Sequence, residues 1–211
     1  TVGFDLDKKR VNSLNSGFDK NLQFEKQDFR KLKKIKFTSN QKHLLNSNIF
    51  FVTVPTPIIS GSNTPNLSLI KSATELISKV IEKGNIIVLE STVYPGVTRN
   101  FIGNIIKKKT KFRLNEDFYL AYSPERINPG DKKTNIKSIR KIIGASNRRT
   151  LEIVSKIYES FLEKKIFKTD SIEIAEAAKV IENTQRDVNI ALVNEFNKIF
   201  NCMSLDTNQI L

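Results

Sequence analysis

The chain has 211 residues, of which 39% are hydrophobic and 27% are charged, as is typical of a soluble globular protein with one or two domains. These proportions exclude a disordered chain, a collagen-like repeat and a small protein held together by disulfides. The formal net charge is +13, yet the 35 lysine and arginine residues are scattered and have no aromatic residues regularly interleaved with them, which argues against nucleic-acid binding.

Hydrophobic patterning predicts an alternation of short strands and helices along the whole chain. In the first half, in chain order, we expect a strand at 2–5, helices at 7–14 and 24–35, a helical turn at 41–46, a strand at 49–54, a helix at 67–82 and a strand at 86–89. In the second half we expect a helix at 97–109, strands at 118–121 and 141–144, a helix at 149–162, a strand at 166–167 and a helix at 171–200. Loops are expected at 60–66 and 123–131.

Apolar strands that alternate with amphipathic helices predict an α/β fold, a doubly wound parallel sheet with helices on both faces. Asp7 is the expected cap of the first helix, and Gly84 is the expected stop of the helix at 67–82. The last helix has neither glycine nor proline, and its apolar side chains lie on more than one face. One domain surface cannot cover all of these faces, so we expect this helix to promote self-association.

Four polar segments follow predicted strands, at the edge of a parallel sheet where ligands bind. These segments contain Asp5, Pro55-Thr56-Pro57, Glu90-Ser91-Thr92 and Ser123-Pro124-Glu125. Together they predict the rim of a binding pocket, although an ordinary polar turn would explain each of them alone. Asp5 has two interpretations, because an acid at this place binds the adenosine ribose in dinucleotide-binding folds and otherwise caps a helix.

The last predicted helix and the loop at 123–131 offer candidate catalytic groups. Lys179 and Asn183 are four residues apart and share a helix face with small or apolar neighbours. An ammonium and an amide placed there could stabilise a developing oxyanion, and the alternative is an exposed lysine hydrogen-bonded to an asparagine. Glu125 could act as a base if burial raises its pKa. Glu90 and Thr92 add an acid and a hydroxyl at a strand end.

The chain has one histidine and one cysteine, and neither has a catalytic setting. His43 has no motif around it, so we interpret it as an ordinary helix residue. Cys202 cannot form an internal disulfide, which favours a reducing, cytoplasmic setting, and we interpret it as a packing residue. Because no apolar run reaches the ~18–20 residues of a membrane span and no signal peptide is present, no membrane association is expected. No metal site is predicted.

Three motifs carry a close resemblance to one known family. They are Glu-Ser-Thr-Val-Tyr-Pro-Gly at 90–96, Tyr-Ser-Pro-Glu-Arg-Ile-Asn-Pro-Gly-Asp at 122–131 and Glu-Ala-Ala-Lys-Val-Ile-Glu-Asn-Thr-Gln-Arg-Asp at 176–187. With these motifs the whole chain resembles the UDP-glucose/GDP-mannose dehydrogenase family. The second motif resembles the branch that acts on UDP-N-acetylhexosamines, because UDP-glucose enzymes usually have an aromatic residue where this chain has Arg126.

The resemblance implies a Rossmann-like NAD-binding domain over residues 1–170, incomplete at its N-terminus, and the start of a central helical dimerisation domain over 171–211. It implies an NAD-dependent enzyme that oxidises the C6 alcohol of a UDP-N-acetylhexosamine to the uronate, for surface polysaccharide precursors. In this family one NAD takes a hydride from the alcohol and a cysteine captures the aldehyde. A second NAD takes a hydride to leave a thioester, which water hydrolyses.

The resemblance also implies a role for individual residues. Glu125 would be the general base of thioester hydrolysis, while Lys179 and Asn183 would hold the reacting oxygen and stabilise its negative charge. Thr92 would place a catalytic water. The residues implied in NAD binding are Asp5, Arg10, Val54, Pro55, Thr56, Ser91 and Thr92. The residues implied in binding the UDP-sugar are Glu125, Arg126, Ile127, Lys179 and Asn183.

The chain departs from the family in two places. Family members begin with a strand and a Gly-x-Gly turn, and they carry the catalytic cysteine in a Gly-Gly-His-Cys segment; this chain has neither. We therefore expect an internal fragment that is inactive alone and that, when complete, forms a homodimer or a larger homo-oligomer. Two alternatives stay open. One is a 3-hydroxyacid or 6-phosphogluconate dehydrogenase, which also has a lysine and an asparagine four residues apart, and the other is a basic nucleic-acid-binding module.

Overall fold

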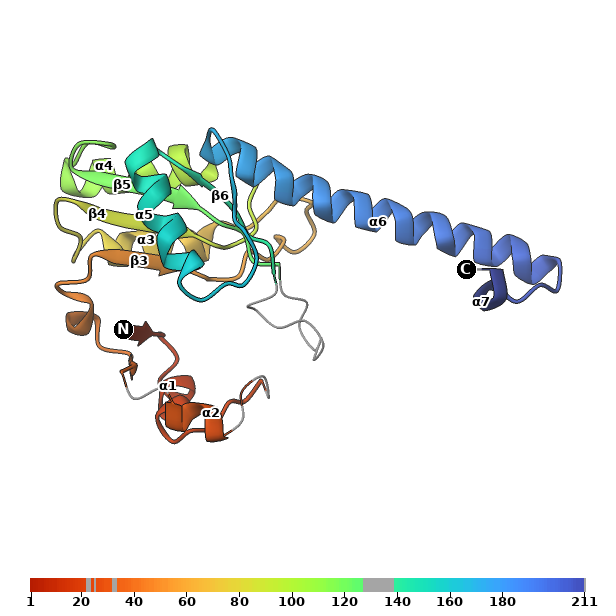
Figure 1. Ribbon diagram of the computed structural model, residues 1–211, viewed down its shortest axis with the longest axis horizontal. Coiled ribbons are helices and arrows are strands. Elements are labelled where there is room, and N and C mark those ends of the chain that lie inside the picture. The colour runs from red at the N-terminus through yellow and green to blue at the C-terminus, as the bar shows by residue number, and fades with distance from the viewer. Residues whose placement is uncertain (22–23, 25, 32–33, 127–138, 211) are drawn as a thin grey trace.

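The computed structural model describes residues 1–211 with the exception of 22–23, 25, 32–33, 127–138 and 211. Its strands form two sheets, and helices connect them along the chain (Figure 1). In the smaller sheet, β1 (Val2–Phe4) pairs in parallel with β2 (Lys36–Thr38). α1 (Lys8–Asn15) and α2 (Lys26–Lys31) lie between these strands in the sequence. β2 was not predicted, because three residues are too few to display a period.

The larger sheet has the strand order β3-β4-β5-β6-β7. Its strands are β3 (Ile49–Val52), β4 (Asn85–Leu89), β5 (Phe118–Tyr122), β6 (Ile142–Ala145) and β7 (Phe167–Lys168). β3, β4 and β5 are parallel, as predicted, whereas β6 runs antiparallel to β5, and β7 runs parallel to β6. The predicted α/β fold with a parallel sheet is therefore confirmed, although β6 and β7 both run opposite to β3, β4 and β5.

β4 explains why this sheet needs helices on both faces, since all five of its residues are buried. Ile87 and Leu89 belong to one hydrophobic cluster, while Ile86 and Val88 belong to a second cluster on the opposite face. The helices that cover the sheet are α3 (Ser68–Ile77), η2 (Val97–Ile102), α4 (Gly103–Thr110) and α5 (Arg148–Glu159). The first cluster lies under α3 and α4, and the second lies under α5.

α6 (Ile172–Cys202) is one uninterrupted helix of 31 residues that projects from the body of the molecule (Figure 1). Its first turn passes so close to β6 that a Cβ atom on Gly144 would lie 2.3 Å from the Ser171 carbonyl oxygen. α7 (Thr207–Ile210), which was not predicted, folds back on the far end of α6, and the Thr207 hydroxyl donates to Asn197 Oδ1 at 2.6 Å. The predicted long helix is therefore confirmed.

Three predicted helices differ most from the structure, two of them in extent and one in helix type. The helix expected at 24–35 is helical only over α2 among the described residues. The helix expected at 67–82 ends at Ile77, where the Ser78 hydroxyl bonds to the Glu75 carbonyl at 2.7 Å and the chain turns toward β4. The segment at 97–109 begins as a π-helix, η2, and continues as α4. The turn at 41–46 is a 3₁₀-helix, η1 (Gln41–Leu44).

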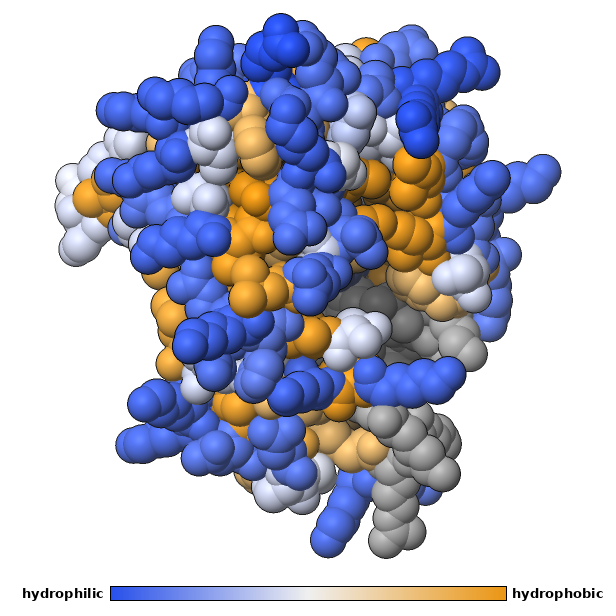
Figure 2. Space-filling model, turned by 90° about the vertical axis from the view of Figure 1, so that its left-hand side faces the viewer, coloured by the Kyte–Doolittle hydropathy of each residue, from blue (hydrophilic) through white to orange (hydrophobic). Residues whose placement is uncertain are grey.

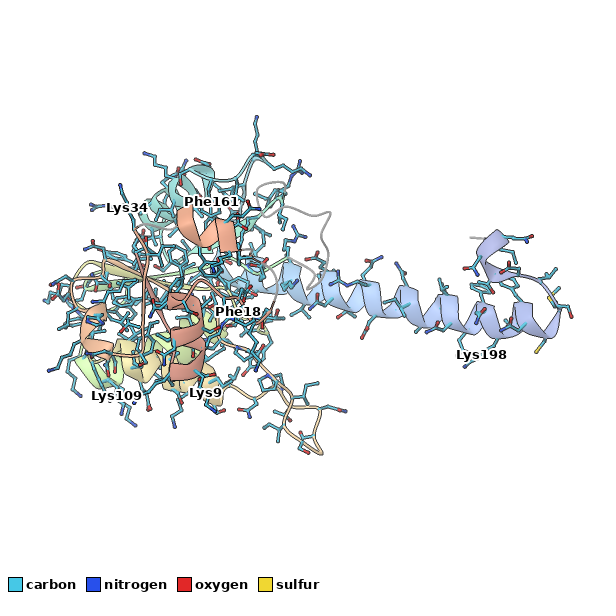
Figure 3. The ribbon with its side chains drawn as sticks, turned by 90° about the horizontal axis from the view of Figure 1, so that it is seen from below. Lys9, Phe18, Lys34, Lys109, Phe161 and Lys198 are labelled. Carbon is cyan, nitrogen blue, oxygen red and sulfur yellow. The ribbon has the colours of Figure 1, made fainter. Side chains whose placement is uncertain are left out.

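Charged residues are spread over the surface of the described part of the chain. Strongly hydrophilic residues cover most of the end of the molecule opposite α6, with narrow bands of hydrophobic residues between them (Figure 2). Four exposed lysines from separate segments point outward in Figure 3: Lys9, Lys34, Lys109 and Lys198. Within the described parts of the chain, no helix has both the length and the apolar composition that crossing a membrane requires.

Candidate active site

Hydrogen bonds join the segments that follow β3, β4 and β5. The Ser91 hydroxyl donates to the Val54 carbonyl at 2.6 Å, and the Thr56 hydroxyl donates to the Thr92 carbonyl at 2.8 Å. The Glu125 backbone N–H donates to the carbonyl of Glu90 at 3.2 Å. The polar strand ends after β3, β4 and β5 therefore form one continuous edge, on which Thr92 and Pro55 are exposed.

Asp5 lies at the exposed carboxyl end of β1, and its backbone N–H donates to the Thr38 carbonyl of β2 at 3.2 Å. Its carboxylate accepts a hydrogen bond from the Asp7 N–H at 2.9 Å. The cap of α1 is Asp7, as predicted, since its carboxylate accepts from the Lys9 N–H at 2.8 Å. Asp5 therefore offers an exposed acid at a strand end, which is the arrangement that suits a ribose hydroxyl.

Arg10 has a partner within the N-terminal part of the chain. Its guanidinium forms an ion pair with the Asp19 carboxylate at 2.7 Å, and the Asp19 side chain is buried. A buried carboxylate is destabilising without a cationic or hydrogen-bonding partner, so this ion pair has a structural role. The contact between Arg10 and NAD stays a prediction.

A buried acid fixes the start of α6 against the start of η2. The Glu176 side chain is completely buried, and its carboxylate accepts hydrogen bonds from the Gly96 N–H at 2.6 Å and the Thr98 N–H at 2.8 Å. The Thr98 hydroxyl donates to the same carboxylate at 2.6 Å. One turn earlier on α6, Glu173 forms an ion pair with Arg99 at 2.6 Å. These contacts determine where the following turns of α6 lie.

Lys179 lies one turn after Glu176 and is 8% exposed, so the alternative of a solvent-exposed surface lysine is wrong. Its ammonium lies 3.9 Å from the Glu182 carboxylate. Burial lowers the pKa of Lys179 below its ordinary value, while Glu182 and Glu125 act in the opposite direction. The negative charges of Glu182 and Glu125 therefore partly offset the effect of burial on the pKa of Lys179.

Arg126 connects the loop after β5 to α6. Its guanidinium pairs with the Glu182 carboxylate, with Nη2 at 3.0 Å and Nε at 3.1 Å. Its third nitrogen, Nη1, donates to the Arg140 carbonyl at 3.0 Å. Its backbone N–H donates to Glu125 Oε1 at 2.6 Å. The loop that holds Glu125 is thus attached to the helix face that holds Lys179.

Two predicted site residues remain. Asn183 is half-buried on α6 and accepts a hydrogen bond from Arg186 Nη2 at 2.7 Å rather than from Lys179. Ile127 lies outside the described residues. Glu176, Glu182 and Lys141 were not among the predicted site residues. Glu176 could have been found from its spacing, because it shares a helix face with Lys179 and Asn183 in a segment of small and apolar residues.

Replacing Glu176 by leucine is expected to lower the free energy of unfolding by about 2–6 kcal/mol, because the N–H groups of Gly96 and Thr98 and the Thr98 hydroxyl lose their acceptor. Urea unfolding of the complete protein that carries this chain measures this effect. Glu173→Leu is the matched control, since it removes a half-exposed ion pair on the same helix and should change stability by about 0–1 kcal/mol. Equal losses in the two variants would contradict the anchoring role of Glu176.

The same carboxylate predicts a pH dependence of stability. Burial raises the pKa of Glu176, so the folded protein binds this proton more tightly than the unfolded chain does. Its contribution is therefore fully present below the ordinary glutamate pKa and is lost as the pH rises through the raised value. Glu176→Gln has no proton to lose, and its stability should lack this decline. Unfolding midpoints of both proteins at a series of mildly acidic pH values test the difference.

Two sequence models of one family match the chain in succession. The NAD binding domain of the UDP-glucose/GDP-mannose dehydrogenase family matches residues 1–162, and the central domain of the same family matches residues 173–211. The UDP-N-acetyl-D-glucosamine 6-dehydrogenase of Salmonella typhi is 44% identical over 210 residues, which cover 100% of this chain and 49% of that protein. Protein CapL of Staphylococcus aureus is 40% identical over 210 residues, which cover 100% of this chain and 49% of that protein.

Solved structures agree with these matches. The UDP-D-ManNAc dehydrogenase of Pyrococcus horikoshii superimposes with a TM-score of 0.89 at 31% identity, over 99% of this chain and 50% of that chain. A ternary complex of GDP-mannose dehydrogenase from Pseudomonas aeruginosa has a TM-score of 0.90 at 21% identity, over 99% of this chain and 49% of that chain. At this level of identity the likeness supports the fold alone. The chain spans about half the length of the curated relatives it matches.

Proposed function

The chain belongs to the UDP-glucose/GDP-mannose dehydrogenase family, and we propose that it forms the NAD-binding domain and the start of the central domain of a UDP-N-acetylhexosamine 6-dehydrogenase. The first domain would cover residues 1–170 and the second would begin at 171. The observation that carries this proposal is the meeting of α6 with the loop after β5. It brings the buried Lys179 together with Glu182, Arg126 and Glu125.

The residues at the strand ends fit NAD. The exposed Asp5 carboxylate can accept hydrogen bonds from ribose hydroxyls, and the bond between Ser91 and Val54 holds the ends of β3 and β4 together as one surface. The exposed Thr92 lies on this surface, where it would place a catalytic water. Bound NAD would accept the hydride that leaves the C6 carbon of the sugar.

Lys179 and Asn183 would hold the C6 oxygen of the substrate. The oxygen gains negative charge as its proton and the hydride leave, and an ammonium and an amide can both donate hydrogen bonds to it. Burial of Lys179 supports this role, because an ammonium removed from water interacts more strongly with a nearby developing charge. Glu176 would set the position of both groups, since it fixes the first turns of α6.

Glu125 would act in the hydrolysis of a thioester formed with a cysteine of the complete protein. It would take a proton from a water molecule while the water oxygen bonds to the thioester carbonyl carbon. The carbon–sulfur bond then breaks, the sulfur leaves as a thiolate, and the uronate is released. Arg126 would contact the UDP-sugar from the same loop, close to both Glu125 and α6.

The proposal is tested by following NADH formation with the complete protein that carries this chain. UDP-N-acetylglucosamine and UDP-N-acetylmannosamine are the expected substrates, and two NADH per uronate are expected if two hydride transfers occur. UDP-glucose and a 3-hydroxyacid are the comparison substrates. Turnover of UDP-glucose in preference to both UDP-N-acetylhexosamines would contradict the proposed substrate class. Turnover of the hydroxyacid alone would contradict the proposed reaction.

We further propose that a second copy covers α6 in the complete protein, which would then be a homodimer or a larger homo-oligomer. Exposed apolar residues follow one another along this helix: Ile174, Ile181, Val188, Leu192, Phe196 and Ile199. Such a stripe is unfavourable in water and is typical of an interface. Light scattering of the complete protein should give at least twice the monomer mass. Leu192→Glu together with Phe196→Glu should lower that mass, and a monomeric wild-type protein would contradict the proposal.

A further inference from the structure

A buried lysine, Lys141, contacts the start of the loop after β5, and we propose that it is a positioning residue for the described loop residues 123–126, which include Glu125. The inference rests on the proposed function, because Lys141 would act on the reaction only through Glu125 and Arg126. It would hold the backbone of the loop at a fixed distance from the end of β4, so that Glu125 faces the reacting atoms.

The contacts of Lys141 join three segments of the chain. Its side chain is 3% exposed, and its ammonium lies 3.0 Å from Glu90 Oε1. The same ammonium donates to the carbonyl oxygens of Ser123 and Pro124, each at 3.4 Å. It also lies 4.9 Å from the centre of the Tyr158 ring. All the protons of one ammonium are thus directed at the end of β4 and at the two residues that precede Glu125.

The surroundings of Glu90 keep this arrangement rigid. Its carboxylate accepts a hydrogen bond from the Tyr158 hydroxyl as well as the one from Lys141. Burial raises the pKa of Tyr158 and the Glu90 carboxylate raises it further, so the hydroxyl keeps its proton and remains a donor. The Glu90 carbonyl accepts from the Glu125 N–H at 3.2 Å. Opening this buried ion pair would leave two buried charges without each other, which is strongly destabilising and favours one loop position.

The antiparallel direction of β6 makes these contacts possible. The register pairs Ala121 with Ala145 and Tyr122 with Gly144. Continued by three residues, it brings Lys141 to the level of Glu125, at the carboxyl ends of β3, β4 and β5. If β6 were parallel to β5, the residue that precedes it would lie at the opposite edge of the sheet. The reversed direction of β6 therefore places the Lys141 ammonium next to the site.

Displacement of these loop residues would also change the positions of the reacting groups. Arg126 lies two residues after Pro124 and pairs with Glu182, which is also the neighbour of Lys179. Arg126 Nη1 also bonds to the carbonyl of Arg140, the residue next to Lys141. A shift of about 1 Å in a catalytic group can lower a rate by about 100-fold. Loss of the Lys141 ammonium should therefore lower kcat by about 10- to 100-fold.

The test compares variants of the complete protein that carries this chain. Lys141→Met with Glu90→Gln removes both buried charges together, so neither charge is left without its partner. Lys141→Arg keeps the charge but changes its geometry. Lys168→Met is the matched control, because Lys168 is a partly exposed lysine on the neighbouring strand β7 that pairs with Glu152 at 2.8 Å. Each protein is assayed for kcat, for KM of the UDP-sugar, for thermal unfolding and for a covalent sugar adduct by rapid-quench mass spectrometry.

We expect the double variant to stay folded, to lose about 10- to 100-fold in kcat with little change in KM, and to accumulate the adduct. Lys141→Arg should restore part of the rate, and Lys168→Met should match the wild type. A folded double variant with normal kcat and no adduct would overturn the role of Lys141, and so would a failure of both Lys141 variants to fold. Glu125→Gln, run in parallel, separates the two proposals: if it forms no adduct, the role proposed for Glu125 fails instead.

Discussion

Replacing Lys179 by alanine in the complete protein is expected to lower kcat by a factor of about 10²–10³ and to change KM much less. The reason is that the ammonium would act on charge that develops on the C6 oxygen only in the transition state. Lys179 is buried one turn after the anchor Glu176, so no other described lysine of α6 can take its place. Steady-state kinetics with the UDP-sugar measure the effect.

Asn183 and Lys198 provide the comparisons for this result. Asn183→Ala should act on the same oxygen, so the double variant should lose less than the product of the two single effects. Lys198→Ala is the matched control, since Lys198 is exposed on the same helix and pairs only with Glu195 among its described contacts, at 2.6 Å. If the Lys179→Ala protein turns over at nearly the wild-type rate, Lys179 has a structural role and not a catalytic one.

Replacing Glu125 by glutamine should stop the reaction at a different point. The first hydride step should persist, while the thioester should accumulate and the steady-state rate should fall by about 10²–10⁴-fold, as expected for loss of a general base. Glutamine retains an oxygen that can accept the hydrogen bond from the Arg126 N–H, which is 2.6 Å from Glu125 Oε1. The change therefore removes the base with little disturbance of the loop.

Rapid-quench mass spectrometry of the Glu125→Gln protein with UDP-sugar and NAD detects the adduct, and a burst of NADH reports the first step. Glu159→Gln, at the exposed end of α5, is the control for loss of one negative charge. Normal turnover without an adduct would show that Glu125 is not the base. Loss of the initial burst as well would place Glu125 in the first oxidation step instead.

Local pattern in the sequence determined the elements and the edge of the sheet where the site lies. β3 and β4 were predicted because apolar runs of strand length are bounded by turn residues, and α6 because no glycine or proline interrupts it. Asp7 was predicted as a cap because its carboxylate needs only the N–H two residues later. Lys179 and Asn183 were placed on one face because helical spacing alone decides it.

Contacts between side chains that are distant in the sequence depend on how the elements pack. Glu176 is 80 residues from Gly96, Arg126 is 56 from Glu182, and Lys141 is 51 from Glu90. Periodicity reports which side of an element is buried, but it carries no information on which partner covers that side. The antiparallel direction of β6 is an example, because either direction would bury Ile143 and Ala145 equally well. The contacts of Lys141 and Glu176 follow from how whole elements pack to bury apolar surface, and that choice is made by the entire chain.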